Sequence, residues 1–283
     1  MVTTESFGAR LRRAMDTRGP LCVGIDPHAS LLAAWGLDDT PDGLERFSLT
    51  AVEALAGRIA VLKPQSAFYE RFGSRGIAVL ERTVAEARAA GALVLMDAKR
   101  GDIGSTMAAY AATYLDPASP LFSDAVTVSP YLGYGSLRPA VEAARESGCG
   151  IFALALTSNP EGAEVQHALR PDGTTVAGSV LGHLRAENAG ERPMGSFGAV
   201  VGATLGDTIA AAGIDLDTGG PLLAPGIGAQ GATPADLPVV FGAALPNVLP
   251  SVSRDVLRHG PDVTALTAAA ARIVEDVRAV VEA

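Results

Sequence analysis

The segment LVLMDAKRGDIGST (residues 93–106) indicates the fold more clearly than any other part of the chain. It begins as an apolar run, bounded by Gly91, that is too short for a typical helix, so we predict a buried strand. The run ends at Asp97, and Lys99, Arg100 and Asp102 follow before a helix-like stretch begins. Ligands bind at the carboxyl ends of the strands in parallel α/β sheets. These charged residues therefore mark a candidate site.

Similar apolar runs recur along the chain. Seven further runs lie near residues 21–25, 59–62, 125–128, 151–156, 199–201, 221–224 and 247–249. The stretches between them have helical period, as at Ile77, Leu80, Val84 and Ala87, which would share one buried face. No break in composition divides the chain. Eight strands that alternate with helices predict an α/β fold, a (β/α)8 TIM barrel that forms a single domain over residues 1–283.

Two additions to the barrel are expected. An amphipathic N-terminal helix covers residues 5–18, and the irregular region 159–198 is an enlarged connection after strand five, with a helix at about Val176–Glu187. An open, doubly wound sheet is the alternative fold. The sequence after the first strand, Gly24-Ile25-Asp26-Pro27, speaks against this alternative because it lacks the glycine-rich dinucleotide-binding fingerprint.

Composition excludes several classes of function. The formal net charge of −9 argues against a nucleic-acid partner or an anionic membrane surface. No apolar stretch is long enough to span a membrane, and the polar N-terminus lacks the apolar core of a secretory signal. Cys22 and Cys149 lie in or beside apolar segments, which is typical of buried free thiols in a reducing compartment. We therefore predict a cytoplasmic protein. The four histidines show no metal-ligand spacing, so no metal site is expected.

Lysine is rare in this chain. Of the 22 basic residues only Lys63 and Lys99 are lysines, and each follows a predicted strand. An ammonium group can give up a proton, whereas a guanidinium group does so far less readily. The two lysines are therefore candidates for proton chemistry rather than for a generic positive charge.

The other predicted strand ends also carry polar residues. Asp26 follows strand one, where it either faces the mouth of the barrel or caps a helix that begins at Pro27. Ser158 follows strand five, with a mouth position and a helix cap again as alternatives. The loop after strand seven contains three glycines and Gln230, and Ser253 and Arg254 follow strand eight. TIM barrels commonly build a phosphate site from these last two loops.

The charges at the mouth suggest a reaction class. Lys63, Asp97, Lys99 and Asp102 would form an array without net charge. The carboxylates keep Lys99 protonated, so it would act as an acid rather than as a Schiff-base nucleophile. A proton-donating lysine beside a phosphate site, without evident metal ligands, favours a reaction that builds negative charge on carbon and then protonates it. Decarboxylation is such a reaction.

These motifs resemble those of the orotidine 5′-phosphate decarboxylase family, in particular its longer bacterial branch. The matching segments span roughly residues 10–280 and include Gly24-Ile25-Asp26-Pro27, Leu62-Lys63-Pro64, Asp97-Ala98-Lys99-Arg100-Gly101-Asp102-Ile103 and Ala224-Pro225-Gly226-Ile227-Gly228. The resemblance implies a TIM barrel that needs no cofactor and converts orotidine 5′-monophosphate to uridine 5′-monophosphate (UMP) and CO2. It also implies a role in the synthesis of pyrimidine nucleotides.

The resemblance further implies roles for particular residues. Lys99 would donate the proton to C6 of the pyrimidine, while Asp97 would crowd the substrate carboxylate and hold Lys99. The residues that would contact the rest of the substrate are Lys63 and Asp26 at the ribose, Ser158 at the pyrimidine edge, and Gln230, Arg254 and the backbone around Ser253 at the phosphate. Asp102 and Thr106 would reach into the site of a neighbouring subunit, so that the active unit is a homodimer. Ser253 stands where the family commonly has a glycine before the phosphate arginine.

Two other functions were weighed. Sugar-phosphate aldolases and decarboxylases of the same barrel class share the Asp-x-Lys-x-x-Asp pattern but bind Mg²⁺, which requires an acidic ligand at the end of strand two. Lys63 occupies that position and would repel the ion. A non-catalytic barrel that binds a phosphorylated ligand is the second alternative. Gathering four charges in a mouth costs desolvation without benefit unless they are used, which favours an enzyme.

Overall fold

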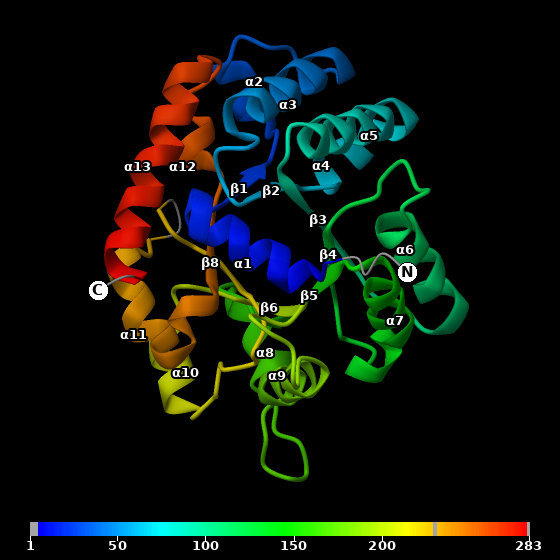
Figure 1. Cartoon of the computed structure of the whole chain (residues 1–283), viewed down its shortest axis with the longest axis vertical. Helices are drawn as coiled ribbons and strands as arrows, with labels where there is room; N and C mark the ends of the chain where they lie inside the picture. Colours follow the sequence, from blue (N-terminus) through cyan, green and yellow to red (C-terminus); the bar gives the residue numbers. More distant parts are fainter. Residues whose placement is uncertain (1–4, 229–230, 282–283) are drawn as a thin grey trace.

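The computed structural model describes residues 5–228 and 231–281 and shows a closed barrel of parallel strands (Figure 1). The strands are β1 (Cys22–Ile25), β2 (Val61–Pro64), β3 (Leu93–Arg100), β4 (Ala125–Val128), β5 (Gly150–Leu156), β6 (Phe197–Val201), β7 (Leu222–Pro225) and β8 (Val248–Val252). Each strand pairs with the next, and β8 pairs with β1. The predicted barrel is confirmed, and the open sheet is excluded.

Helices alternate with the strands. The α-helices are α1 (Phe7–Arg18), α2 (Ala29–Ala34), α3 (Pro41–Leu55), α4 (Ala67–Glu70), α5 (Gly73–Ala89), α6 (Gly104–Leu115), α7 (Arg138–Ser147), α8 (Ala163–Gln166), α9 (Val176–Glu187), α10 (Gly206–Ala211), α11 (Leu237–Phe241), α12 (Arg254–Leu257) and α13 (Val263–Val281). Short 3-10 turns are η1 (Tyr134–Leu137), η2 (Pro160–Gly162), η3 (Pro234–Asp236) and η4 (Gly242–Asn247). The enlarged connection after β5 contains η2, α8 and α9, and α9 has the predicted bounds.

Two local predictions need correction. The strand β3 does not stop at Asp97 but continues to Arg100, so Asp97 and Lys99 belong to the strand itself. A strand therefore continues through charged residues at the point where the barrel opens to solvent. Asp26 does not cap a helix, because α2 begins at Ala29 and its N-cap residue is His28.

One cluster of buried side chains fills the barrel interior. It takes an inward-facing residue from every strand: Cys22, Val61, Leu95, Ala125, Phe152, Val200, Leu223 and Leu249. The inward-facing residues of a barrel pack as layers, so the barrel is a solid core rather than a pore. A second, larger core lies between the outer face of the strands and the surrounding helices. Both cysteines are buried and free, as predicted.

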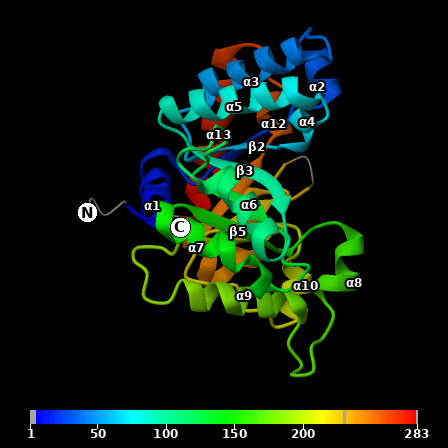
Figure 2. The same cartoon turned by 90° about the vertical axis from the view of Figure 1, so that its right-hand side faces the viewer.

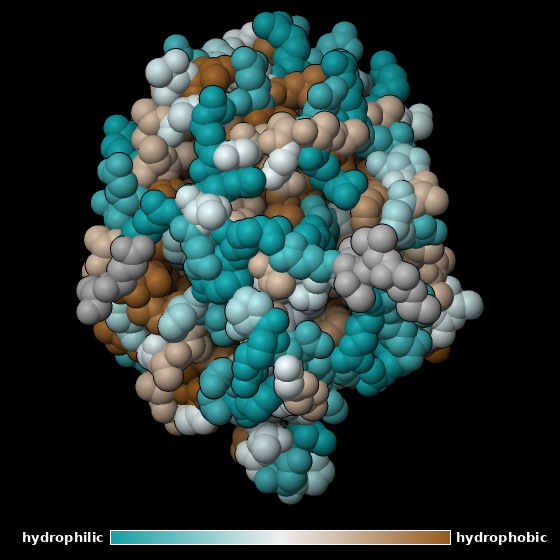
Figure 3. Space-filling view, in the orientation of Figure 1, coloured by the Kyte–Doolittle hydropathy of each residue, from teal (hydrophilic) through white to brown (hydrophobic). Residues whose placement is uncertain are grey.

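The helix α1 closes the amino-terminal end of the barrel. It crosses that end in Figure 1, and its apolar residues Phe7, Leu11 and Met15 join the inner core. The Phe7 ring meets Phe152 edge-on with centroids 6.0 Å apart. Gly150 makes this contact possible, because a Cβ there would lie 2.4 Å from the Phe7 ring. Figure 3 shows hydrophilic residues over the centre of this face, where α1 lies. In Figure 2, α1 and α8 lie on opposite sides of the barrel.

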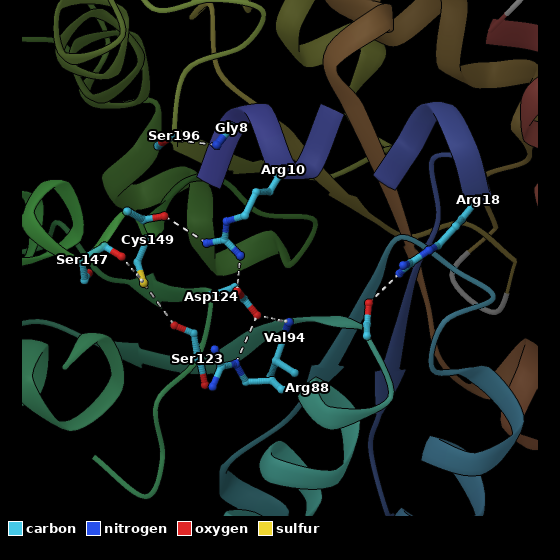
Figure 4. A network of polar contacts seen from close by, with 12 residues as sticks. Gly8, Arg10, Arg18, Arg88, Val94, Ser123, Asp124, Ser147, Cys149 and Ser196 are labelled. Atoms are coloured by element: carbon cyan, nitrogen blue, oxygen red, sulfur yellow. Dashed lines mark hydrogen bonds and ion pairs between the residues drawn. The ribbon is translucent and has the colours of Figure 1, made fainter. Parts of the chain in front are cut away.

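Asp124 ties α1 to the first residues of the strands (Figure 4). Its buried carboxylate forms an ion pair with Arg10 of α1 and accepts a hydrogen bond of 2.9 Å from the Val94 backbone N–H. The Arg88 guanidinium lies 3.7 Å from the same carboxylate. Arg10 also donates to the Gly148 carbonyl at 3.0 Å. One carboxylate thus holds the helix, β3 and β4 together at the end of the barrel remote from the predicted site.

Replacing Asp124 with alanine is expected to lower the free energy of unfolding by about 3 kcal/mol, because Arg10 and the Val94 N–H lose a buried partner. Urea unfolding followed by circular dichroism measures this loss. Arg13→Ala is the matched control, because Arg13 of the same helix pairs with Glu5 in an exposed ion pair. The control is expected to unfold like the parent. Equal stability of the Asp124 variant and the parent would contradict the role given to Asp124.

None of the helices in the described part of the chain combines the length and the apolar character needed to cross a membrane.

Candidate active site

A cavity of about 420 Å³ lies at the carboxyl ends of the strands. Seven of the predicted site residues line it: Asp26, Lys63, Asp97, Lys99, Ser158, Ser253 and Arg254. Gln230, predicted to hold phosphate, lies outside the described residues. Because parallel strands end at the same edge of the barrel, residues far apart in the chain meet in this one cavity.

The centre of the cavity is a chain of two ammonium groups and one carboxylate. The Lys63 Nζ donates to Asp97 Oδ2 at 2.9 Å, and the Lys99 Nζ donates to Asp97 Oδ1 at 2.6 Å. Lys63 and Asp97 are buried, whereas the side chain of Lys99 is 43% exposed. The exposed end of this chain of charges is thus the Lys99 ammonium, which faces the space where a ligand binds.

The charges of this group stabilise one another. Burial alone would raise the pKa of Asp97, but the charges of Lys63 and Lys99 and their hydrogen bonds outweigh it and hold that pKa well below its usual range. Burial likewise opposes the charge on Lys63, yet Asp97 and then Asp26 raise the pKa of Lys63 above its usual value. Asp97 is therefore a carboxylate and Lys63 an ammonium at neutral pH.

Thr127 of β4 belongs to the same group and is not among the residues predicted from the sequence. Its hydroxyl donates to Asp97 Oδ1 at 2.9 Å and accepts hydrogen bonds from the backbone N–H groups of Ala98 and Lys99. A signal for it exists in the run AVTV, because side chains alternate along a strand. Ala125 points into the barrel, so Thr127 does too, and a polar residue at an inward position near a strand end lies at the mouth.

Lys99 has a strained backbone. Its φ is 48°, the single left-handed non-glycine residue among those described. Such conformations cost free energy and are found mainly where function requires them. The pairing register of β3 with β4 also shifts between Met96 and Arg100. The backbone departs from regular strand geometry at the residue that presents the ammonium.

The opposite side of the cavity is built from the loops after β7 and β8. Gly226 and Gly228 have φ values of 113° and 77°, which favour glycine. A Cβ at Gly228 would lie 2.0 Å from a carboxylate oxygen of Asp255, so a larger residue would have to displace that side chain as well as adopt a left-handed backbone. Arg254 and Ser253 complete this side. Backbone exposed by glycines next to an arginine is a typical anion site.

Two buried oxygens at the cavity have no hydrogen-bond partner among the described residues. They are Asp26 Oδ1 and Ser253 Oγ. A buried polar atom without a partner is costly, and such atoms are rare in folded proteins. Both atoms belong to residues that line the cavity. They lie at the ends of β1 and β8, two strands that pair directly, where each is available to a polar group of a ligand.

Ser158 lies on the part of the cavity wall that leads into the enlarged connection. Gln166 of α8 accepts a hydrogen bond from the Thr157 N–H at 2.9 Å and donates to the Thr157 hydroxyl at 2.7 Å. This pair anchors the connection to the end of β5. Ser158 and Asn159 follow directly and line the cavity. The start of region 159–198 is therefore part of the site rather than a remote insertion.

Asp102 and Thr106 do not line this cavity. The Asp102 carboxylate accepts a hydrogen bond of 2.8 Å from the N–H of the adjacent Ile103, and Thr106 is exposed in the first turn of α6. Within one chain the predicted four-charge array is thus a three-charge group. Ile103, Tyr131 and Leu132 are exposed apolar residues on the neighbouring loops.

Further polar cavity residues outside the prediction include His28, Gln65 and Asp255. The His28 ring packs edge-on against Phe68 with centroids 4.3 Å apart. Gln65 follows Lys63 by two residues and pairs with Asp97 in an isolated β-bridge. The position of Gln65 just after a strand end is the sequence signal that would have indicated it.

Other titratable clusters offer no obvious chemistry. Among residues 5–228 and 231–281, no group of three or more histidine, cysteine or acidic side chains is arranged to hold a metal ion. Burial raises the pKa of the Cys22 thiol to about 12, so Cys22 is a neutral thiol beneath the cavity and not a nucleophile.

Comparison with known proteins identifies relatives over the full chain. Residues 19–269 match the family described as orotidine 5′-phosphate decarboxylase / HUMPS. The chain is 75% identical to the orotidine 5′-phosphate decarboxylase of Streptomyces coelicolor over 279 residues, which cover 99% of each chain. It is 64% identical to the protein of the same name from Salinispora arenicola over 276 residues, covering 97% of this chain and 98% of that one.

Solved structures that resemble this chain carry the same name as its sequence relatives. A crystal structure described as a putative orotidine 5′-phosphate decarboxylase from Streptomyces avermitilis superposes with a TM-score of 0.97 at 75% identity and covers 100% of this chain and 98% of its own. The structure of Leishmania donovani OMP decarboxylase gives a TM-score of 0.78 at 30% identity, with 98% of this chain and 100% of that chain covered.

Proposed function

The chain belongs to the orotidine 5′-phosphate decarboxylase family, and we propose on this basis that it converts orotidine 5′-monophosphate to UMP and CO2 in pyrimidine nucleotide synthesis. The observation that supports this most directly is the Lys63–Asp97–Lys99 group, which lies opposite an anion site in one cavity. The cavity thus has a proton donor at one end and a phosphate-binding site at the other, an arrangement that suits a nucleotide.

The proposed step needs a proton and no redox partner. The bond between C6 and the carboxylate carbon breaks, CO2 leaves, and the electron pair stays on C6. The Lys99 Nζ then gives its proton to C6, and a proton from water restores the ammonium. The positive charge of Lys99 stabilises the carbanion as it forms, because it is already fixed beside the reacting carbon. This step uses no cofactor.

Asp97 is proposed to position Lys99 as its main role. Its Oδ1 accepts a hydrogen bond of 2.6 Å from the Lys99 ammonium, and its Oδ2 accepts one from the Lys63 ammonium. The carboxylate therefore cannot rotate away without breaking two ion pairs. The resemblance also implies that Asp97 crowds the substrate carboxylate, and the resulting repulsion adds to the effect.

The remaining residues are proposed to bind the nucleotide. Asp26 and Lys63 contact the ribose, because the unpaired Asp26 Oδ1 accepts a hydroxyl hydrogen bond. Arg254 and the backbone near Ser253 hold the phosphate, together with Gln230. Ser158 reads the edge of the pyrimidine. Binding the remote phosphate helps catalysis when its binding energy is used to order the site around the reacting carbon.

The test is the loss of orotidine 5′-monophosphate absorbance with purified protein in the presence of EDTA. Conversion to UMP supports the proposal and opposes the Mg²⁺-dependent alternative, whose metal position is occupied by Lys63. Tight binding of the nucleotide without conversion would instead support a non-catalytic ligand-binding barrel. We also expect the protein to act in the cytoplasm.

We further propose that the active unit is a homodimer. Asp102 and Thr106 lie outside their own cavity, although both follow the catalytic strand directly. The apolar side chains of Ile103, Tyr131 and Leu132 are 63%, 76% and 53% exposed on the loops beside them. A second copy that covers these side chains would bring Asp102 and Thr106 to the partner's cavity.

Mixing two inactive variants tests this arrangement. Lys99→Ala and Asp102→Ala subunits are each expected to form inactive dimers. After exchange of equal amounts, half of the dimers are mixed, and each has one intact site made of Lys99 from one subunit and Asp102 from the other. Activity is therefore expected to return to about a quarter of the parent value. If the mixture stays inactive although an affinity tag on one variant co-purifies the other, Asp102 acts within its own subunit.

A further inference from the structure

We propose that Thr127 is a positioning residue for Lys99, because its single hydroxyl fixes both the Asp97 carboxylate and the backbone of Lys99. This inference rests on the proposed role of Lys99 as proton donor. Thr127 lies on β4 and is 1% exposed, so its hydroxyl is shielded from bulk water and forms its hydrogen bonds with protein groups.

The hydroxyl uses all of its hydrogen-bonding capacity in the catalytic group. It donates to Asp97 Oδ1 at 2.9 Å, the oxygen that also receives the Lys99 ammonium. Its two lone pairs accept the N–H groups of Ala98 at 3.0 Å and of Lys99 at 2.9 Å. A threonine hydroxyl has one donor and two acceptor positions, so each is occupied. Rotation of the hydroxyl to any other position would break at least one of these three hydrogen bonds.

The need for these contacts comes from the bulge in β3. Met96 pairs with Val126 and Arg100 with Val128, so three residues of β3 lie opposite Thr127 alone. The strand ladder cannot supply partners for the N–H groups in this bulge. The Thr127 side chain supplies two of them, where a regular strand would use backbone carbonyls. The left-handed φ of 48° at Lys99 is thereby held by hydrogen bonds from a neighbouring strand.

The position of the Lys99 ammonium depends on this backbone. Lys99 contacts Asp97, two residues earlier on the same strand, from a left-handed backbone whose φ of 48° sets the direction of its side chain. Without the hydroxyl, Lys99 loses a backbone partner and Asp97 loses a donor. The ammonium would then sample more positions. A shift of about 1 Å in a reacting group lowers rates by roughly 100-fold.

Kinetics with two substitutions test the inference. Thr127→Val keeps the shape and removes the hydroxyl, and it is expected to lower kcat by ~10- to 100-fold while KM changes by less than ~3-fold. Thr127→Ser restores the hydroxyl and should return kcat to within ~3-fold of the parent. Thr83→Val is the matched control, because Thr83 is also fully buried but bonds to the Val79 carbonyl within α5. The control should leave kcat unchanged.

Several outcomes would overturn the inference. The first is a kcat of the Thr127→Val variant that equals the kcat of the parent. Another is a loss that serine does not rescue and that is accompanied by an equal loss of UMP affinity, which would indicate general disruption of the site.

Lysine resonances give a second readout that does not depend on turnover. Because Lys63 and Lys99 are the only lysines, isotope-labelled lysine yields two ammonium signals, which Lys99→Arg assigns. Thr127→Val is expected to shift or broaden the Lys99 signal. The Lys63 signal should stay unchanged, because Lys63 binds the other oxygen of Asp97. An unchanged Lys99 signal would overturn the inference. If the parent does not convert orotidine 5′-monophosphate, the proposed function fails, and this signal still decides the role of Thr127.

Discussion

Replacing Lys99 with alanine is expected to lower kcat for decarboxylation by roughly 10⁵-fold. At an effective dielectric constant of about 20, a unit charge about 4 Å from the forming carbanion contributes on the order of 4 kcal/mol, which corresponds to about 1,000-fold in rate. Loss of a positioned proton donor adds typically about 100- to 10,000-fold. The affinity for UMP should stay within about 3-fold of the parent, because the proposed phosphate site lies across the cavity.

Lys99→Arg separates the two contributions. It keeps the positive charge but holds its proton too firmly to donate it. We expect the arginine variant to regain at most a small part of the lost activity. Single-turnover absorbance measurements and UMP titration by calorimetry check both variants. Turnover within 10-fold of the parent in Lys99→Ala would exclude Lys99 as the proton donor.

Replacing Asp97 with asparagine is expected to lower kcat by at least about 1,000-fold, again with UMP affinity near normal. The amide has a similar shape but no charge, so it holds the Lys99 and Lys63 ammonium groups weakly. Asp124→Asn is the matched control, because Asp124 is equally buried at the other end of the barrel. The control should lower stability and leave kcat of the folded protein unchanged. An active Asp97→Asn variant would remove Asp97 from the mechanism.

The same variant should change how stability depends on pH. Since the pKa of Asp97 is lower in the folded protein than in the unfolded chain, its ionisation stabilises the fold above the unfolded pKa of about 3.9. This contribution is lost as the pH falls toward the folded pKa, by up to about 1.4 kcal/mol per pH unit. Between pH 5 and pH 3, the free energy of unfolding measured with urea should therefore fall less steeply for Asp97→Asn than for the parent. Equal slopes would mean that Asp97 is not paired as described.

The architecture of the barrel could be predicted from the chain alone. Each of the eight apolar runs became a strand, because a buried parallel strand needs continuous apolar residues whatever its neighbours are. The placement of Lys63 and Lys99 in one cavity also followed, since all parallel strands of a barrel end at the same face.

Other features required the three-dimensional structure. Thr127 is separated from Asp97 by 30 residues, and their contact depends on the register between β3 and β4. The left-handed backbone of Lys99 has no local signal, because lysine has no preference for that conformation. The position of Asp102 outside the cavity depends on the loop path after β3 rather than on its spacing from Lys99.

The sequence by itself thus determined the number and order of strands, the closed barrel and the charged residues at its mouth. These properties follow from apolar periodicity, which each segment carries locally. The tertiary structure decided which of the charges pair, which hydroxyl holds them and which carboxylate lies outside the cavity. Those contacts depend on strand register and on a bulge, where a shift of one residue redirects a side chain to the opposite face of the sheet.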